Sequence, residues 1–143
     1  MFEMRNKFSV SEWVDLQVLA LWVLMRVASA DGTATTKEWN EILVILKNFG
    51  TAESLIGQVT RSITYAQIPK LNEHSAKFRN RVPAVRAMAL ERLGAVEYGA
   101  LVAGLMAMAV EVARFEGRTD SGLAAHISLE EQDILLKLAA ELS

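Results

Sequence analysis

The chain has 143 residues, of which 52% are hydrophobic and 22% are charged, with only 2 Pro and 8 Gly. This length fits one domain, and the composition excludes a disordered, collagen-like or linker-dominated chain because so much apolar surface must be buried. A formal net charge of -2 excludes a global positive field that would hold the protein on nucleic acid. Because cysteine is absent, disulfides, cysteine zinc sites and thiol nucleophiles are excluded as well, which suits a reducing compartment.

The N-terminal ten residues carry Arg5 and Lys7 but no apolar stretch that ends in small residues, so a secretory signal peptide is not expected. The longest uncharged apolar runs are Leu16 to Met25 and Tyr98 to Val110. Both are shorter than the roughly 20 residues that span a bilayer, and they predict two central core helices. We therefore expect a cytoplasmic protein, with a peripheral position at the inner face of the membrane as the alternative.

The apolar periodicity predicts three helices in the first part of the chain. The first is capped by Ser11, runs to about residue 30, is apolar nearly all round, and is ended by Asp31-Gly32. The second begins with the Ser/Thr-x-x-Glu spacing of a capping box at Thr35 to Glu38 and stops at Gly50. The third is capped by Thr51 and runs to about residue 64.

The pattern weakens over residues 65–82 and predicts one short helix between turns. Another helix starts at Pro83 and is interrupted near Gly94. A long helix then runs from about Ala95 to Phe115, is closed by Glu116-Gly117, and carries small residues that allow another helix to approach closely. The last helix starts at Ser128 to Glu131, again with capping-box spacing, and no alternating pattern supports a sheet.

Two segments of the chain repeat one pattern: an apolar helix, an acidic residue followed by Gly, a loop, and a Ser/Thr-x-x-Glu helix start. The acidic residue is Asp31 in the first copy and Glu116 in the second, and the second loop is longer by eight residues. Two copies predict a pseudo-two-fold bundle rather than a solenoid. The apolar stripes that follow fall in register, with Ile42, Leu43 and Leu46 matched to Leu135, Leu136 and Ala139.

An apolar helix that ends in Ala28-Ser29-Ala30-Asp31-Gly32, a short loop, a capping-box helix start and a degenerate second copy resemble the TerB-like family. That family includes tellurite-resistance proteins and the N-terminal region of membrane-anchored DnaJ-like proteins. The resemblance covers most of the chain and is strongest over residues 27–38, while the second copy departs from it in having Glu116 and the longer loop. It implies a compact all-α bundle of about seven helices, a single domain over residues 1–143, and a role in metal-ion binding or stress response.

The acidic residues at the two turns are the candidate metal ligands. A carboxylate at a helix C-terminus faces the negative end of the helix dipole at a cost of about 0.3–1 kcal/mol, and Asp31 and Glu116 are both predicted there. If the two units face each other, Asp31, Glu38, Glu116 and Glu131 converge into the oxygen ligand set that Ca²⁺ or Mg²⁺ prefers. In the alternative interpretation, the two helix-start glutamates cap backbone amides and the other two acids are solvated turn residues.

A basic stretch without any acidic residue covers residues 77–90 and contains Lys77, Arg79, Arg81 and Arg86. Guanidinium groups suit phosphate or acidic lipid headgroups, whereas the alternative is a solvated helix face. We expect at most weak, salt-sensitive contact with polyanions and no specific nucleic-acid binding, since the aromatic residues that stack on single-stranded bases are missing nearby.

No serine nucleophile motif and no phosphate-binding loop is present, and His74 and His126 lack the spacing of a helical metal site, so an enzyme is not expected. Two function classes remain. The first is a module that binds a divalent cation, without an organic cofactor, in a tellurite or stress-response context. The second is an interaction module that docks a partner protein or a membrane surface without any metal. The resemblance and the acidic turns favour the first class.

Overall fold

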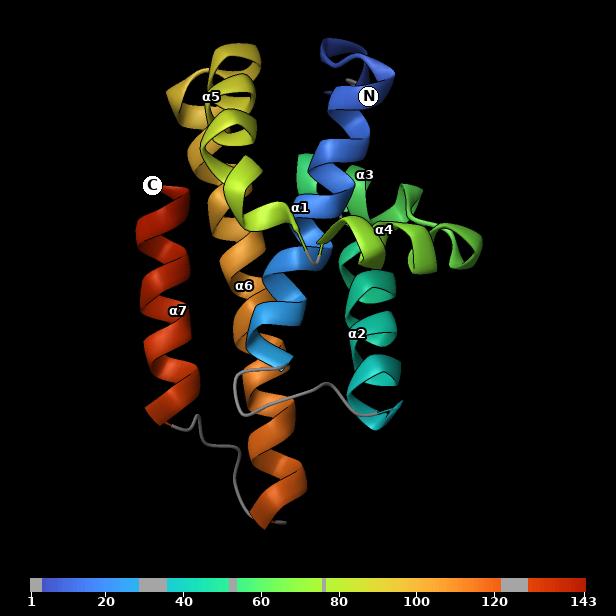
Figure 1. The fold of residues 1–143 in the computed structure, drawn as a ribbon, viewed down its shortest axis with the longest axis vertical. Coiled ribbons are helices and arrows are strands. Elements are labelled where there is room, and N and C mark those ends of the chain that lie inside the picture. Colours follow the sequence, from blue (N-terminus) through green and yellow to red (C-terminus); the bar gives the residue numbers. More distant parts are fainter. Residues whose placement is uncertain (1–3, 29–35, 52–53, 76, 122–128) are drawn as a thin grey trace.

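The computed structural model describes residues 4–28, 36–51, 54–75, 77–121 and 129–143. Within these ranges the chain forms helices and no strand, as predicted. The α-helices are α1 Val10–Ala28, α2 Thr36–Phe49, α3 Leu55–Ser62, α4 Ile68–Ser75, α5 Val82–Leu93, α6 Ala95–Ser121 and α7 Leu129–Leu142 (Figure 1). Three short 3₁₀ helices are η1 Met4–Lys7, η2 Tyr65–Gln67 and η3 Phe78–Arg81. The prediction of a helical bundle is confirmed.

Helix α1 is the centre of the bundle. Twelve of its 19 residues are buried, and it contacts α3, α4, α5, α6 and α7. Every residue from Leu16 to Leu24 is 5% exposed or less. A helical stretch that is apolar on all faces has no polar face to turn toward water, so the surrounding helices must enclose it. Figure 1 shows α1 between α6 and α7 on one side and α2 and α3 on the other.

Helix α6 contacts α1, α2, α3, α5 and α7, as expected for the second central helix, but unlike α1 it buries only one face. Its buried residues recur at three- and four-residue steps, as in Tyr98, Leu101, Leu105 and Met108. The exposed residues between them are small, and a small side chain exposes little apolar surface to water. The exposed small residues are Gly99, Ala100, Ala103 and Ala107.

By length and composition, Ala95–Arg114 of α6 is apolar enough to cross a membrane, and 33% of that stretch is buried in the bundle. A core helix of a globular protein meets the same two criteria.

The predicted close approach of another helix occurs at Gly104. A Cβ atom built on Gly104 would lie 2.6 Å from Cγ2 of Ile56, which belongs to α3. Only a hydrogen fits in this space, so the absence of a side chain sets the distance between α6 and α3. At Gly99, by contrast, nothing lies within 4 Å of such a Cβ.

Ser9 caps α1, so the prediction of Ser11 as its cap is wrong. The backbone N–H of Glu12 donates to Ser9 Oγ over 3.2 Å, and the backbone N–H of Ser9 donates to Glu12 Oε1 over 2.8 Å. This reciprocal pair is a capping box. Ser11 is the second residue of the helix itself. A capping side chain must instead come from the residue just before the helix, which is Ser9.

Ser54 caps α3, so the prediction of Thr51 as the cap is also wrong. The Oγ of Ser54 accepts from the backbone N–H of Gly57 over 3.4 Å. Thr51 instead belongs to the turn that ends α2, where its hydroxyl donates to the carbonyl of Asn48 over 2.8 Å.

Helix α6 continues through Glu116 and Gly117 to Ser121, so the prediction that these two residues close it is wrong. A glycine in a helix costs about 1 kcal/mol relative to alanine, but it ends a helix only where the backbone turns left-handed. That conformation is found at Gly94, where φ is +84°, and it separates α5 from α6 as predicted.

Helix α7 packs on α1 and α6. Leu138 and Leu142 are buried, and Ile134 and Leu135 are half-buried, so these four residues form the inner stripe of α7. Leu136 is 72% exposed, so its matching to the half-buried Leu43 of α2 is wrong.

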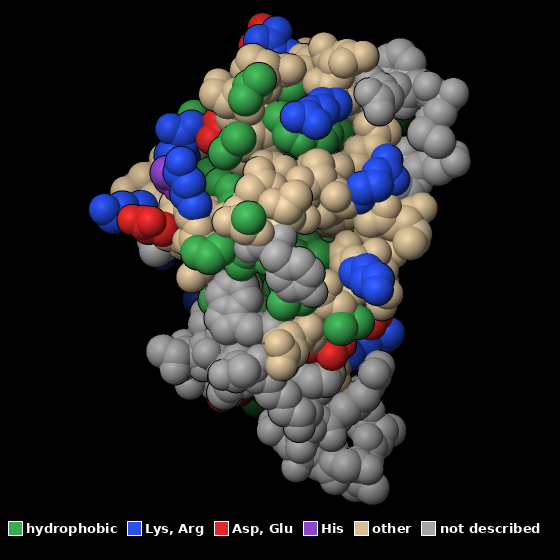
Figure 2. Space-filling model, turned by 90° about the vertical axis from the view of Figure 1, so that its right-hand side faces the viewer, with side chains coloured by type: hydrophobic (Ala, Val, Ile, Leu, Met, Phe, Trp, Pro, Cys, Tyr) green, Lys and Arg blue, Asp and Glu red, His purple; other side chains and the backbone are tan. Residues whose placement is uncertain are grey.

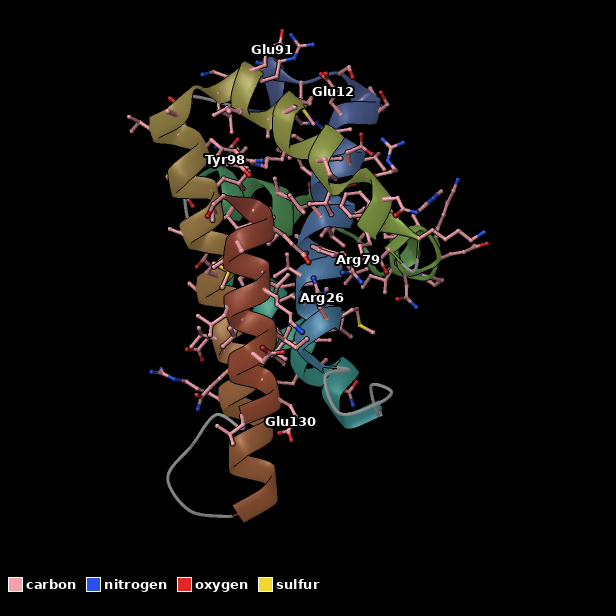
Figure 3. All side chains as sticks on the ribbon, turned by 60° about the vertical axis from the view of Figure 1, so that its left-hand side comes forward. Glu12, Arg26, Arg79, Glu91, Tyr98 and Glu130 are labelled. Atoms are coloured by element: carbon pink, nitrogen blue, oxygen red, sulfur yellow. The ribbon has the colours of Figure 1, made fainter. Side chains whose placement is uncertain are left out.

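A salt bridge ties α7 to α1. Arg26 Nη1 lies 2.6 Å from Glu141 Oε2, and the same guanidinium stands 5.1 Å from the centre of the Trp22 ring (Figure 3). The aromatic face and the carboxylate together fix the position of this cation.

Candidate functional sites

The predicted metal ligands lie in segments that the structure describes to different extents. Asp31 falls outside the described residues. The backbone of Glu38 lies in the first turn of α2 and that of Glu116 in the last two turns of α6, while their side chains are outside the described part. Glu131 is described completely. The end of α1, the start of α2, the end of α6 and the start of α7 all lie at the same end of the bundle (Figure 1).

Glu131 is buried, with 5% of its surface exposed, in the first turn of α7. The neighbouring Glu130 is exposed at the same end of the helix (Figure 3). Both acidic residues lie in the first turn of α7, at the positive end of the helix dipole. The spacing of Glu131 from Leu138 and Leu142 places it on the inner face, so periodicity alone indicates its burial.

No group of three or more His, Asp or Glu side chains that could hold a metal ion is found among the residues whose side chains are described. The predicted convergence of Asp31, Glu38 and Glu116 on Glu131 involves side chains outside that part of the structure.

A groove of about 760 Å³ lies between α1 and the segment from α4 to η3. We call it the basic groove. Its floor is apolar and contains Val14, Val18 and Phe78, while acidic residues are present at Asp15 and Glu73. The basic residues that line it are Lys70, His74, Lys77 and Arg81. Figure 2 shows the histidine of this face between Lys and Arg side chains, with an acidic side chain next to them.

The charges in the basic groove are only partly paired. Arg81 Nη2 donates to both carboxylate oxygens of Asp15, over 3.1 and 3.0 Å. Within the described ranges, Lys70, His74 and Lys77 form no ion pair. The groove therefore presents the unpaired ammonium groups of Lys70 and Lys77 above an apolar floor.

The four residues of the predicted basic stretch do not form one patch. Lys77 and Arg81 line the basic groove. Arg79 is exposed on η3 (Figure 3) and does not line the groove. Arg86 belongs to α5 and donates to the backbone carbonyl of Ser143, next to the end of α7.

The sequence carried one signal for this groove that the predicted site did not use. Lys70, His74 and Lys77 follow one another at steps of four and three residues, which places side chains on the same face of a helical segment. The wall supplied by α1 carries no such signal, because its position opposite α4 depends on tertiary packing.

A smaller hollow of about 330 Å³ lies between α2 and α3. It is lined mainly by apolar residues such as Leu43, Leu46 and Ile63, with Lys47 and Arg61 at its edge.

A polar cluster joins α1 to the end of α3 in the interior. Ser62 Oγ accepts from Trp13 Nε1 over 3.0 Å and from Gln17 Nε2 over 2.9 Å, and donates to the carbonyl of Val59 over 2.7 Å. None of these side chains titrates near neutral pH, and the cluster serves to hold the two helices together.

The shifted pKa values belong to groups at helix ends. The backbone N–H of Ser9, and then Arg92 at 3.1 Å, hold the pKa of Glu12 below its ordinary 4.5. Burial raises the pKa of Tyr98 above its ordinary 10.0, and its hydroxyl donates to the carbonyl of Leu142. Both groups fasten helices rather than line the basic groove.

Comparisons with family models, with curated proteins and with solved structures found no match to this chain. The class that fold and sites define is therefore an all-α bundle of seven described helices with a basic groove on one side.

Proposed function

We propose that the protein is a non-catalytic, TerB-like module that binds a divalent cation, Ca²⁺ or Mg²⁺, in a tellurite or stress-response context. The cation lies at the end of the bundle where the two helix-loop-helix units meet. The observation that carries the proposal is the buried carboxylate of Glu131 at that end.

The packing of the helices supports two related units. The first unit consists of α1 and α2, and the second of α6 and α7. Helix α1 packs on α6. Helix α2 packs on α6, and α7 packs on α1. Each second helix thus contacts the first helix of the other unit, as a pseudo-two-fold axis would place them, whereas α7 also packs on α6 of its own unit and α2 has no comparable contact with α1 among the described residues. The units differ because α6 continues four residues beyond Gly117, so part of the longer second connection is helix.

The buried position of Glu131 favours a cation physically. Attraction between a carboxylate and an ion is stronger where water is excluded. Carboxylates that gather there repel one another, and a hard cation with six to eight oxygen ligands, as Ca²⁺ takes, relieves that repulsion. Asp31, Glu38 and Glu116 are the proposed further ligands from the neighbouring helix ends.

The proposal predicts that added Ca²⁺ or Mg²⁺ raises the melting temperature of the metal-stripped protein. A cation at a hundred times its Kd stabilises the folded state by about 2.7 kcal/mol. Glu131→Gln and Asp31→Asn should each abolish most of this rise. Glu130→Gln removes an exposed carboxylate from the same turn and should leave the rise intact, which makes it the matched control.

Calorimetric titration measures the same binding directly. Absence of both heat and a melting shift at millimolar cation would contradict the proposal. If the cation raised the melting temperature of Glu131→Gln as much as that of the wild type, Glu131 would not be a ligand of the cation.

A further inference from the structure

We propose that the basic groove docks an acidic segment of a partner protein, which inserts large apolar side chains onto the groove floor and places its carboxylates on Lys70, His74 and Lys77. This surface is separate from the cation end of the bundle. The inference therefore stands or falls independently of cation binding.

The floor of the groove is fixed by the core. Val18 and Phe78 are 3% and 2% exposed, and the Phe78 ring lies 6.0 Å from that of Trp22 on the central helix α1. A volume of about 760 Å³ is within the usual range of binding sites, about 300–1,000 Å³. The hollow is thus large enough for several side chains.

The rim carries the basic side chains of Lys70, Lys77 and Arg81 against the carboxylates of Asp15 and Glu73, so its formal charge is positive. Lys70, His74 and Lys77 are exposed at the groove and form no ion pair among the residues described. The side chain of Arg81 is 60% exposed although it is bound to Asp15. Since a guanidinium has five N–H donors, Arg81 keeps donors for a second carboxylate.

The shape favours an inserted peptide over a membrane surface. A bilayer is broad and flat, and peripheral proteins bind it with protruding apolar side chains beside basic ones. Here the apolar atoms lie beneath the basic rim, where a flat surface does not reach them. Single-stranded nucleic acid is disfavoured as well, because Phe78 is the one Phe, Tyr or Trp among the described residues that line the groove, too few for stacking successive bases.

The test uses fluorescently labelled peptides of about 12 residues, long enough for three helical turns. One peptide combines Glu with Leu, the second replaces each Leu by Ser, and the third replaces each Glu by Lys. Fluorescence anisotropy should show binding of the Glu/Leu peptide, clearly weaker binding of the Glu/Ser peptide, and none of the Lys/Leu peptide. Binding should weaken as salt rises, because the rim charges are exposed.

Variants locate the binding. Reversing two rim charges with Lys70→Glu and Lys77→Glu should weaken the Glu/Leu peptide by about tenfold or more. Both lysines are exposed, so the fold should tolerate the change. Lys47→Glu is the matched control, since it makes the same charge reversal at the smaller hollow.

Three outcomes would overturn the inference. The first is failure of the Glu/Leu peptide to bind, or equal binding of the Glu/Ser peptide. The second is an equal loss in Lys47→Glu, which would place binding elsewhere. The third is binding of the protein to vesicles of anionic phospholipid, lost in the rim variants, without binding of any peptide, which would assign the groove to a membrane.

Discussion

At the scale of single residues, Ser62 makes three hydrogen bonds through one hydroxyl group. Its hydroxyl is the acceptor for both Trp13 Nε1 and Gln17 Nε2. Ser62→Ala leaves these two donors without that acceptor, and a buried unsatisfied donor costs about 1–3 kcal/mol. We expect a loss of this size in urea denaturation. Trp13→Phe combined with Ser62→Ala should cost less than the sum of the two single changes, and strict additivity would show that the hydrogen bond contributes little.

Glu12 makes stability depend on acid. Its folded-state pKa lies below the ordinary 4.5 because Ser9 N–H and Arg92 favour the charged form. The unfolded chain therefore takes up this proton first, so the stabilisation is fully present above pH 4.5 and is lost as pH falls through the folded-state pKa.

The measurement compares Glu12→Gln with the wild type. The difference in melting temperature should be largest above pH 4.5 and should shrink below it. Glu130→Gln is the control, because that carboxylate forms no ion pair within the described ranges. A difference between Glu12→Gln and wild type that does not change with pH would be evidence against this role for Glu12.

At the scale of helices, two glycines on α6 have opposite expected effects. Gly104→Ala places a Cβ 2.6 Å from Cγ2 of Ile56, and the β-branched Ile56 side chain has little freedom to turn away. Overpacking of this kind costs about 1–3 kcal/mol, more than the helix propensity of about 1 kcal/mol that alanine gains over glycine. We expect Gly104→Ala to lower the free energy of unfolding.

Gly99→Ala is the matched change at an open position and should raise the free energy of unfolding, by up to about 1 kcal/mol. Ile56→Ala should relieve most of the loss caused by Gly104→Ala in a double-mutant cycle. Equal stabilisation by the two glycine substitutions in urea denaturation would show that α6 and α3 are not held at this distance.

The start of α1 shows why helix ends were predicted less well than helices. Ser9 and Ser11 both precede the apolar run, and only Ser9 has Glu12 three positions later. The capping-box spacing therefore indicates Ser9, whereas proximity to the apolar run led to the wrong prediction of Ser11. At Gly117 no comparable local signal exists, since whether a glycine continues a helix depends on what packs around it.

At the scale of the whole molecule, α1 should be the last part of the chain to lose its structure. It is enclosed by five other helices, whereas α4 buries only Leu71 and Ser75. Amides buried in this way exchange with solvent only through global unfolding. In native-state hydrogen exchange we expect the amides of α1 to be the slowest and those of α4 to exchange through local opening. Equal protection of both helices would contradict this order.

Much of the bundle could be predicted because α1 is apolar on every face and must lie in the centre. The exposed side of α6 was harder, since small residues resemble core residues in composition while exposing little surface. The basic groove required tertiary information: Lys70 and Lys77 are separated from Val14 and Asp15 by more than fifty positions. The inward position of Glu131, in contrast, is indicated by its helical spacing from Leu138 and Leu142, although it was not predicted.

A single residue, Gly94, separates the last residue of α5 from the first of α6. Its left-handed backbone is a conformation that other residues rarely adopt. Without this corner, residues 82–121 would form one continuous rod. The apolar face of α5, with Val85 and Ala89, would then leave its own bundle and could be covered only by a second chain in the same state. The corner at Gly94 keeps the apolar face of α5 on its own bundle, and we expect substitutions that straighten it to favour exchange of α5 between two copies.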